Sequence, residues 1–404
     1  MKILSLLLIL TLSITSLILP ISASDFEDIT DNGINSEADI LGTSGEDIEL
    51  SAISAILMDA ETGTVLYSKN PGEPLPPASV TKIMTLLLVA EAIRDGEVAL
   101  DDKVIVSANA ASMGGSQIFI KEGEEFTVEE LLKSTVIASA NDAAVALAEQ
   151  ISGSEASFVK RMNERASELG MKNTTFENVT GLDDTVTKHL TSAYDIALMS
   201  KELIKHDVIL KYSGIWQDSI RDGEFILTNT NRLVRYYDGC TGLKTGSTDK
   251  AGFCISATAK RDGMHLISVI MGAPTRDERN KDARALLDYG FAEYKLYKDP
   301  ASKLEEVDVR GGTIPSTSVY SKGFSLLVNS SDYKRIEKKY DIPEAIYAPI
   351  EKGAKVGRIV YSLDGKELGS SDIIVSEDIR GLGYFDILLR LLSDIACKKA
   401  KDAQ

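Results

Sequence analysis

The chain is poor in the residues that build metal centres and disulfide frameworks. It has three histidines, and their positions show no metal-ligand spacing. It also has three cysteines, too few to form a disulfide framework in a protein of 404 residues. We therefore expect no metal centre, and we predict that Cys240 and Cys254 are small residues facing the core.

Basic residues are scarce relative to acidic ones. Lys and Arg number 44 against 61 Asp and Glu, so the net charge is −17, which argues against nucleic acid as a partner. Nine of the acids fall within residues 24–50, where there is no Lys or Arg. This composition predicts a solvated, flexible leader. A hydrophobic content of 44% nevertheless indicates a globular protein, and the length favours two domains.

Only one long apolar run is present, at the N-terminus. It spans residues 3–19, follows Lys2 and ends in small residues up to Ala23. This pattern is typical of a secretory signal peptide, so we predict that residues 1–23 are a signal and that the protein is exported. The alternative is a retained membrane helix. It is less favoured because the run is barely long enough to span a bilayer.

Patterns of apolar residues predict an α+β domain over residues 51–298, with helices packed on an antiparallel sheet. A β-hairpin is predicted over 54–67, followed by helices over 78–93, 128–137, 142–151, 155–169 and 192–205. Strands are predicted over 242–247, 253–259 and 265–271, before a closing helix over 279–289. A strand, a block of helices and then antiparallel strands is typical of this fold class.

The pattern changes beyond residue 300. Short alternating runs separated by Gly, Asp and Ser predict a small all-β domain over residues 302–378, with no catalytic constellation. The spacing of apolar residues over 381–404 predicts an amphipathic helix with one apolar face. Such a helix either docks on its own domain or lies in a membrane interface. Three lysines near its end favour the membrane, whereas Asp386 and Asp394 count against it.

One Ser-x-x-Lys tetrad, at residues 79–82, is the candidate catalytic centre. A serine hydroxyl needs a nearby base, and residues three apart on a helix share a face, so Lys82 can reach Ser79. Burial and the helix N-terminus would lower the pKa of Lys82 enough for it to act as that base. The tetrad alone is weak, because three further copies begin at Ser157, Ser247 and Ser331.

Two further motifs follow the tetrad in order. Ser139-Ala140-Asn141 falls in a short break between two predicted helices, where a loop can direct Ser139 into a cleft. Asn141 and Asp142 can cap the following helix, and Asn141 can also face the substrate, since the two roles are not exclusive. Ser-x-Asn also occurs at Ser68 and Ser107, which are not placed in such a break.

The tripeptide Lys244-Thr245-Gly246 occurs once and lies in a predicted strand. Lys244 and the hydroxyl of Thr245 can hold a carboxylate, and Gly246 allows a ligand to approach the strand closely. The backbone N–H groups of Ser79 and Ser247 are candidates for an oxyanion hole.

These motifs resemble those of the serine D-alanyl-D-alanine carboxypeptidases, the low-molecular-weight penicillin-binding proteins of peptidase family S11. The similarity extends to the residues around each motif, to Gly114-Gly115-Ser116 and to the segment 180–195, and it covers the chain from residue 51 to 297 and beyond. Residues 221–223 and 229–231 resemble the sporulation-type version from Gram-positive bacteria. Thr230 departs from the family, where some members carry an Arg near the carboxylate site.

The resemblance implies a β-lactamase/transpeptidase-like fold and a mechanism without any cofactor. Ser79 attacks the bond between the last two D-alanines of a peptidoglycan pentapeptide stem, and Lys82 takes its proton. Ser139 and Lys244 relay a proton to the departing D-alanine, and water hydrolyses the acyl-enzyme. β-Lactams are implied as covalent inhibitors of Ser79. The expected location is the extracellular face of the cytoplasmic membrane or the cell wall, with the C-terminal helix at the membrane surface.

Three other functions share these motifs. A class A β-lactamase would carry a deacylating Glu in a Glu-x-x-x-Asn segment before the Lys-Thr-Gly strand, and we find none. A transpeptidase or endopeptidase would differ only in the acceptor. A penicillin-binding sensor or scaffold would be acylated without turning over. Release of D-alanine distinguishes turnover from acylation alone.

Overall fold

The computed structural model describes residues 48–184, 186–389 and 391–392. Its first part is built on a five-stranded antiparallel sheet in the order β2-β1-β9-β8-β7. The strands are β1 (Ser54–Asp59), β2 (Val65–Lys69), β7 (Cys240–Thr248), β8 (Gly252–Arg261) and β9 (Met264–Ala273). β7 lies at one edge of this sheet, so it can pair with an added peptide strand on its free side.

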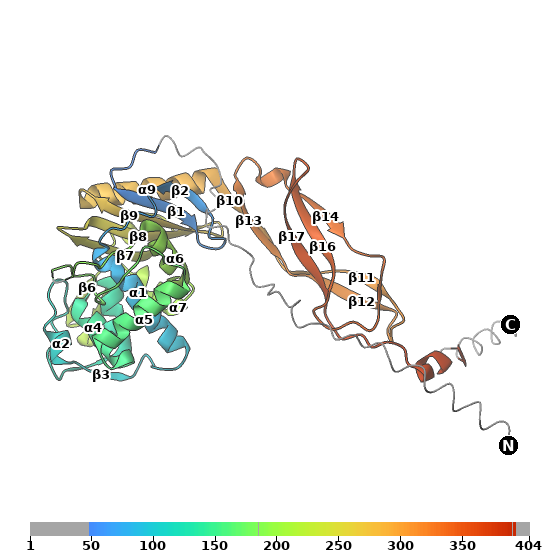
Figure 1. Ribbon diagram of the computed structural model, residues 1–404, viewed down its shortest axis with the longest axis horizontal. Helices are drawn as coiled ribbons and strands as arrows, with labels where there is room; N and C mark the ends of the chain where they lie inside the picture. The colour runs from blue at the N-terminus through green and yellow to red at the C-terminus, as the bar shows by residue number, and fades with distance from the viewer. Residues whose placement is uncertain (1–47, 185, 390, 393–404) are drawn as a thin grey trace, which may run out of the picture. The chain divides into compact units, whose positions relative to one another are not determined.

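Helices cover both faces of this sheet. The long helix α9 (Arg276–Glu293) packs along one face, while α1 (Lys82–Arg94) and α6 (Ala193–Leu203) lie on the other (Figure 1). Side chains from β1, β8, β9 and α9 form one apolar core on the α9 face. The predicted α+β class, with helices on an antiparallel sheet, is confirmed.

The remaining helices of this part are α2 (Ala108–Ala111), α3 (Val128–Ile137), α4 (Asn141–Ser152), α5 (Glu155–Glu168), α7 (Asp207–Ser213) and α8 (Leu233–Tyr236). Of these, α3, α4, α5 and α7 contact α1, which is buried along most of its length, while α2 packs on α4 and α8 on β7. Two small hairpins, β3 (Lys103–Ile105) with β4 (Glu125–Thr127) and β5 (Gln217–Ile220) with β6 (Phe225–Thr228), complete it. The helix predicted from residue 78 begins differently: residues Ala78–Thr81 form a 3-10 turn, η2, and α1 starts at Lys82.

The second part of the chain is rich in strands. β10 (Tyr294–Asp299) pairs with β13 (Phe324–Asn329). A six-stranded sheet has the order β14-β16-β17-β12-β11-β15, and its apolar residues form a separate core. Its strands are β11 (Ser302–Arg310), β12 (Ser316–Ser321), β14 (Glu337–Asp341), β15 (Ala345–Tyr347), β16 (Lys355–Leu363) and β17 (Lys366–Val375). The predicted β-rich part is therefore confirmed, and the domain limits of 298, 302 and 378 remain predictions.

The end of the described chain is helical at residues 384–389 and 391–392. Its apolar side chains are exposed, among them Phe385 at 75% and Leu391 at 55%. Within the described ranges, no helix has the length and apolar character needed to cross a membrane. The signal peptide, most of the acidic leader and the end of the amphipathic helix lie outside the described residues, so these expectations stay predictions.

Candidate active site

The structure brings Ser79 and Lys82 together as the tetrad predicts. Ser79 lies in η2 and is half-buried, and the Nζ of Lys82 donates to its Oγ at 3.1 Å. Lys82 is fully buried, and its Nζ also donates to Oδ1 of Asn141 at 2.5 Å and to the carbonyl oxygen of Thr180 at 2.9 Å. These three acceptors direct the amine at the serine, so Lys82 is placed to exchange a proton with Ser79.

Asn141 belongs to this cluster and does not cap α4. The N-cap residue of α4 is Ala140, with no side-chain capping bond, so the capping interpretation of Asn141 is wrong. The Nδ2 of Asn141 donates to the carbonyl oxygen of Gly114 at 2.6 Å, which orients its Oδ1 toward Lys82. The reason is long-range packing: Lys82 lies 59 positions away in sequence, and local propensity cannot report such a partner.

Ser139 lies in the break between α3 and α4, as predicted. It is the residue before the α4 N-cap and adopts a left-handed backbone with φ of +62°. A non-glycine residue rarely adopts this conformation, and such strain is common at functional sites. The Nζ of Lys244 donates to its Oγ at 2.8 Å. The second and third motifs, which are 105 positions apart, therefore meet at one pair of side chains.

The Lys-Thr-Gly segment lies on β7 beside the nucleophile. A Cβ on Gly246 would lie 2.7 Å from the backbone N of Ser79 and 2.9 Å from that of Val80, so only glycine fits this approach of β7 to η2. The hydroxyl of Thr245 donates to Oγ1 of Thr230 at 2.7 Å. Ser247, the next residue on β7, is exposed. The structure thus brings Ser79, Lys82 and Asn141 together, joins Ser139 to Lys244, and places Gly246 against the backbone of Ser79, while Thr245 and Ser247 lie on the same strand β7.

Burial lowers the pKa of both lysines. Burial lowers the pKa of Lys82 well below its ordinary value, and the nearby charge of Lys244 lowers it further, against an opposing effect of Asp142. Burial, followed by the charge of Arg279, lowers the pKa of Lys244 to about 7. Lys82 can therefore be present as a free base near neutral pH, as the predicted mechanism requires.

The motifs did not reveal a buried arginine, Arg279, whose charge acts on Lys244. It lies near the start of α9, is 3% exposed, and its charge acts on Lys244. Its guanidinium donates to Oδ1 of Asn280, and no Asp or Glu of the described chain forms an ion pair with it. Burial lowers the pKa of Arg279 to about 10, so it remains charged at neutral pH. A buried cation without an acidic partner suits an anionic ligand.

The loop that carries the nucleophile is held from behind by His189. Ala78, directly before Ser79, has a φ of +48°, and its carbonyl oxygen accepts from the hydroxyl of Thr81 at 2.8 Å. The same hydroxyl lies 2.7 Å from Nε2 of His189, whose Nδ1 accepts the N–H of Glu177 at 3.0 Å. Since Nδ1 is an acceptor, Nε2 carries the proton and donates to Thr81. The sequence contains no local signal for this contact.

The copies of the motifs at Ser107, Ser157 and Ser331 lie apart from the three ordered motifs. Ser157 and Ser331 are exposed, and Ser107 caps α2. Of the cysteines predicted to face the core, Cys254 is buried and Cys240 is half-buried, and they do not pair across β7 and β8. Three ordered motifs therefore meet near Ser79, and Ser247, which begins another copy of the tetrad, lies on β7 beside them.

Comparisons with known proteins agree with this geometry. Residues 42–275 match the family model described as D-alanyl-D-alanine carboxypeptidase, peptidase S11. The chain belongs to this family. Residues 291–380 match the C-terminal domain of penicillin-binding protein 5, which corresponds to the strand-rich second part.

Individual members of the S11 family cover most of the chain. D-alanyl-D-alanine carboxypeptidase DacF of Bacillus subtilis is 46% identical over 353 residues, covering 85% of this chain and 90% of the relative. DacC of Escherichia coli is 35% identical and covers 82% and 84%. The structure of penicillin-binding protein 5 from Haemophilus influenzae superposes with a TM-score of 0.71 at 30% identity, over 84% of this chain and all of that one.

The S11 assignment establishes the activity at the level of the family. The chain is a D-alanyl-D-alanine carboxypeptidase, a hydrolase of the penicillin-binding proteins that act on peptidoglycan peptides. A structural relative, penicillin-binding protein D2 from Listeria monocytogenes, has been solved in ampicillin- and cefotaxime-bound forms. The ampicillin-bound form has a TM-score of 0.56 at 34% identity and covers 61% of this chain and 99% of that one.

Proposed function

We propose that this S11 enzyme removes the terminal D-alanine through an acyl-enzyme formed on Ser79. The observation that carries the proposal is the bond from the buried Nζ of Lys82 to Oγ of Ser79 at 3.1 Å. Lys82 takes the hydroxyl proton as Oγ attacks the carbonyl carbon of the penultimate D-alanine. The backbone N–H groups of Ser79 and Ser247 receive the developing oxyanion. Gly246 supports this placement, because its close approach brings β7 to the backbone N of Ser79.

Departure of D-alanine requires a proton on its nitrogen. Ser139 delivers it, and Lys244, which donates to Oγ of Ser139 at 2.8 Å, restores the proton on that hydroxyl. Lys82 passes the proton that it took from Ser79 to the Ser139–Lys244 pair and becomes a free base again. It then accepts a proton from the water that hydrolyses the ester and returns it to Oγ of Ser79 as the ester bond breaks. General acid–base steps of this kind contribute about 100- to 10,000-fold each.

The carboxylate of the terminal D-alanine binds on the side of β7 where the positive charge is concentrated. Lys244 and Arg279 are both buried, and the charge of Arg279 acts on Lys244. The hydroxyl of Thr245, next to Lys244 on β7, donates to Thr230. Thr230 replaces the arginine that some family members carry, and Arg279 supplies the charge in this chain. Asn141, bonded to Lys82, orients the acyl side of the substrate.

The proposed setting is the cell wall of a spore-forming Gram-positive bacterium. The relation to the Bacillus subtilis enzyme supports this setting, and a role in cortex peptidoglycan is part of the proposal. Export by residues 1–23 and contact of the C-terminal helix with the membrane belong to the same proposal. The exposed apolar residues at 384–389 support the membrane contact.

The test is D-alanine release from diacetyl-Lys-D-Ala-D-Ala, with penicillin labelling measured in parallel. Ser79→Ala is expected to abolish both release and labelling. The matched control is Ser157→Ala, which removes the same hydroxyl from an exposed copy of the tetrad and should change neither. Release retained by Ser79→Ala would refute the nucleophile. Labelling of the wild type without release would show a protein that is acylated but does not turn over.

A further inference from the structure

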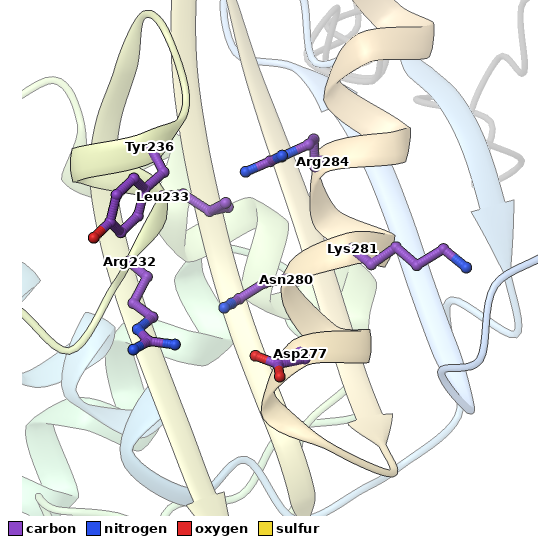
Figure 2. Close-up of a pocket in the computed structure, with 7 residues that line it drawn as sticks. All are labelled: Arg232, Leu233, Tyr236, Asp277, Asn280, Lys281 and Arg284. Carbon is purple, nitrogen blue, oxygen red and sulfur yellow. The ribbon is translucent and has the colours of Figure 1, made fainter.

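A cavity of about 310 Å³ is lined by residues of α8 and α9. Its volume falls in the range of about 300–1,000 Å³ that is usual for small-molecule sites. Figure 2 shows Arg232 and Tyr236 on one side of this space. Asn280 and Arg284 are directed toward them from α9, whereas Lys281 extends away (Figure 2). The lining is completed by Leu233 and Asp277.

Two arginines give this cavity a positive charge in a protein whose net charge is −17. Arg232 is the N-cap residue of α8, Arg284 lies on α9, and both are exposed. In the described part of the chain, the ion pairs formed by arginines involve other residues than these two. The acid of the lining, Asp277, belongs to the first turn of α9, where the positive end of the helix favours a carboxylate. Both guanidinium groups are therefore available to an anionic ligand.

The amide of Asn280 adds an oriented donor to the two guanidinium groups. Its Oδ1 accepts from Nε and Nη2 of Arg279 at 3.2 and 2.9 Å. Arg279 is buried, with 3% of its surface exposed, so it holds the amide oxygen on the inner side. The two N–H groups on Nδ2 of Asn280 are then directed into the cavity (Figure 2). A buried side chain thus fixes the direction in which this donor faces a ligand.

Tyr236 gives the cavity a flat apolar surface. This side chain is 61% exposed, yet its ring lies 6.4 Å from the ring of Trp216, which is half-buried. The guanidinium of Arg235 lies over both rings, 5.4 Å from that of Trp216 and 5.6 Å from that of Tyr236. These aromatic and cation–π contacts hold the exposed ring in place. A sugar ring, which has apolar C–H faces and hydroxyl groups at its edge, fits the face and the hydroxyl of such a tyrosine.

We propose that this cavity binds a sugar that carries a phosphate group. A phosphate monoester has a charge of about −1.5 to −2 at pH 7 and three acceptor oxygens, which match the guanidinium groups of Arg232 and Arg284 and the amide of Asn280. Guanidinium groups bind phosphate through paired N–H donors. The sugar ring packs on Tyr236. A free sugar phosphate and the phosphorylated end of a glycan present the same group, and neither requires the proposed role of Ser79.

The test is a titration of the full chain with mannose 6-phosphate, followed by the fluorescence of Trp216 and by calorimetry. Trp216 is the single tryptophan of the chain and lies against Tyr236, so its emission should change as the cavity fills. Mannose should bind at least about 100-fold more weakly, because it lacks the charge. Glucuronate should bind at least about tenfold more weakly, because a carboxylate has one charge and two oxygens. Pentamannose 6-phosphate distinguishes the two sources: tighter binding indicates a glycan, and equal binding a single sugar phosphate.

Variants locate the binding in the cavity. Arg232→Gln and Arg284→Gln should each raise the Kd for mannose 6-phosphate at least about tenfold, the size expected for one charged hydrogen bond. Arg380→Gln, which removes the same charge from another exposed position, should leave the Kd unchanged. Asp277→Asn should lower the Kd about twofold or more, because it removes the acid of the lining. Thermal unfolding at the wild-type temperature shows that each variant is folded.

Three results would overturn the proposal. The first is the absence of both a fluorescence change and a heat of binding with mannose 6-phosphate at millimolar concentration. The second is equal affinity for glucuronate, which would show that the cavity does not recognise phosphate. The third is an unchanged Kd in folded Arg232→Gln and Arg284→Gln, which would place the binding outside this cavity.

Discussion

Replacing His189 by alanine tests whether the support behind the nucleophile matters for catalysis. His189 is 5% exposed. The change removes its Nε2–H, which donates to the hydroxyl of Thr81, and its Nδ1, which accepts from the N–H of Glu177. Leaving a buried polar partner unpaired costs about 1–3 kcal/mol, so the loss of two partners should lower the free energy of unfolding by about 2–6 kcal/mol at pH 7.5.

The same change should slow acylation of Ser79. Thr81 donates to the carbonyl oxygen of Ala78, whose left-handed backbone costs about 1–2 kcal/mol and persists only while the surroundings hold it. If Ala78 relaxes, Ser79 moves relative to Lys82, and a misplacement of about 1 Å can cost about 100-fold. We expect the second-order rate of penicillin acylation to fall about 10- to 100-fold.

The pH dependence of the free energy of unfolding provides an independent test of the role of His189. Burial lowers the pKa of His189 from 6.5 to about 4, so the folded protein keeps this ring neutral while the unfolded chain protonates it. The stability that the neutral ring contributes is present above pH 6.5 and is lost as the pH falls to about 4, a total of about 3 kcal/mol. The stability difference between wild type and variant should therefore shrink between pH 7.5 and 4.5.

Urea denaturation at the two pH values and stopped-flow acylation at pH 7.5 measure these effects. An acylation rate equal to that of the wild type would show that the His189–Thr81–Ala78 contacts do not position the nucleophile, however large the loss of stability. A stability difference that stays constant between the two pH values would show that His189 is not kept neutral in the fold.

Three further changes act on the site directly. Lys82→Arg should lower acylation about 100- to 10,000-fold, because a guanidinium cannot act as a base, and labelling at the wild-type rate would contradict this role. kcat/KM for D-alanine release should fall above about pH 7, where Lys244 loses its charge; a profile that stays flat to pH 9 would show that this charge is not needed. Gly246→Ala should slow acylation more than about tenfold, because its Cβ would meet the backbone N of Ser79 at 2.7 Å; unchanged acylation kinetics would refute the close approach.

Much of the fold could be predicted from local patterns. The helices over 128–137 and 155–169 and the strands of β7, β8 and β9 appear within a few residues of their predicted limits. Apolar periodicity is a property of neighbouring residues, so it survives without knowledge of the tertiary structure. The start of α1 was predicted less well, since packing against β7 and the left-handed Ala78 produce a 3-10 turn where the sequence favours a helix.

The sequence by itself determined which three motifs could cooperate, because their order and residue types define a nucleophile, a base, a relay and a carboxylate anchor. Only the tertiary structure decided that Asn141 binds Lys82, that the carbonyl of Thr180 is its third partner, that the charge of Arg279 acts on Lys244, and that His189 contacts Thr81. These contacts join residues 59 to 108 positions apart or act through burial and charge. Contacts between residues so far apart in sequence, and the removal of water from around a charge, arise only when the chain is folded.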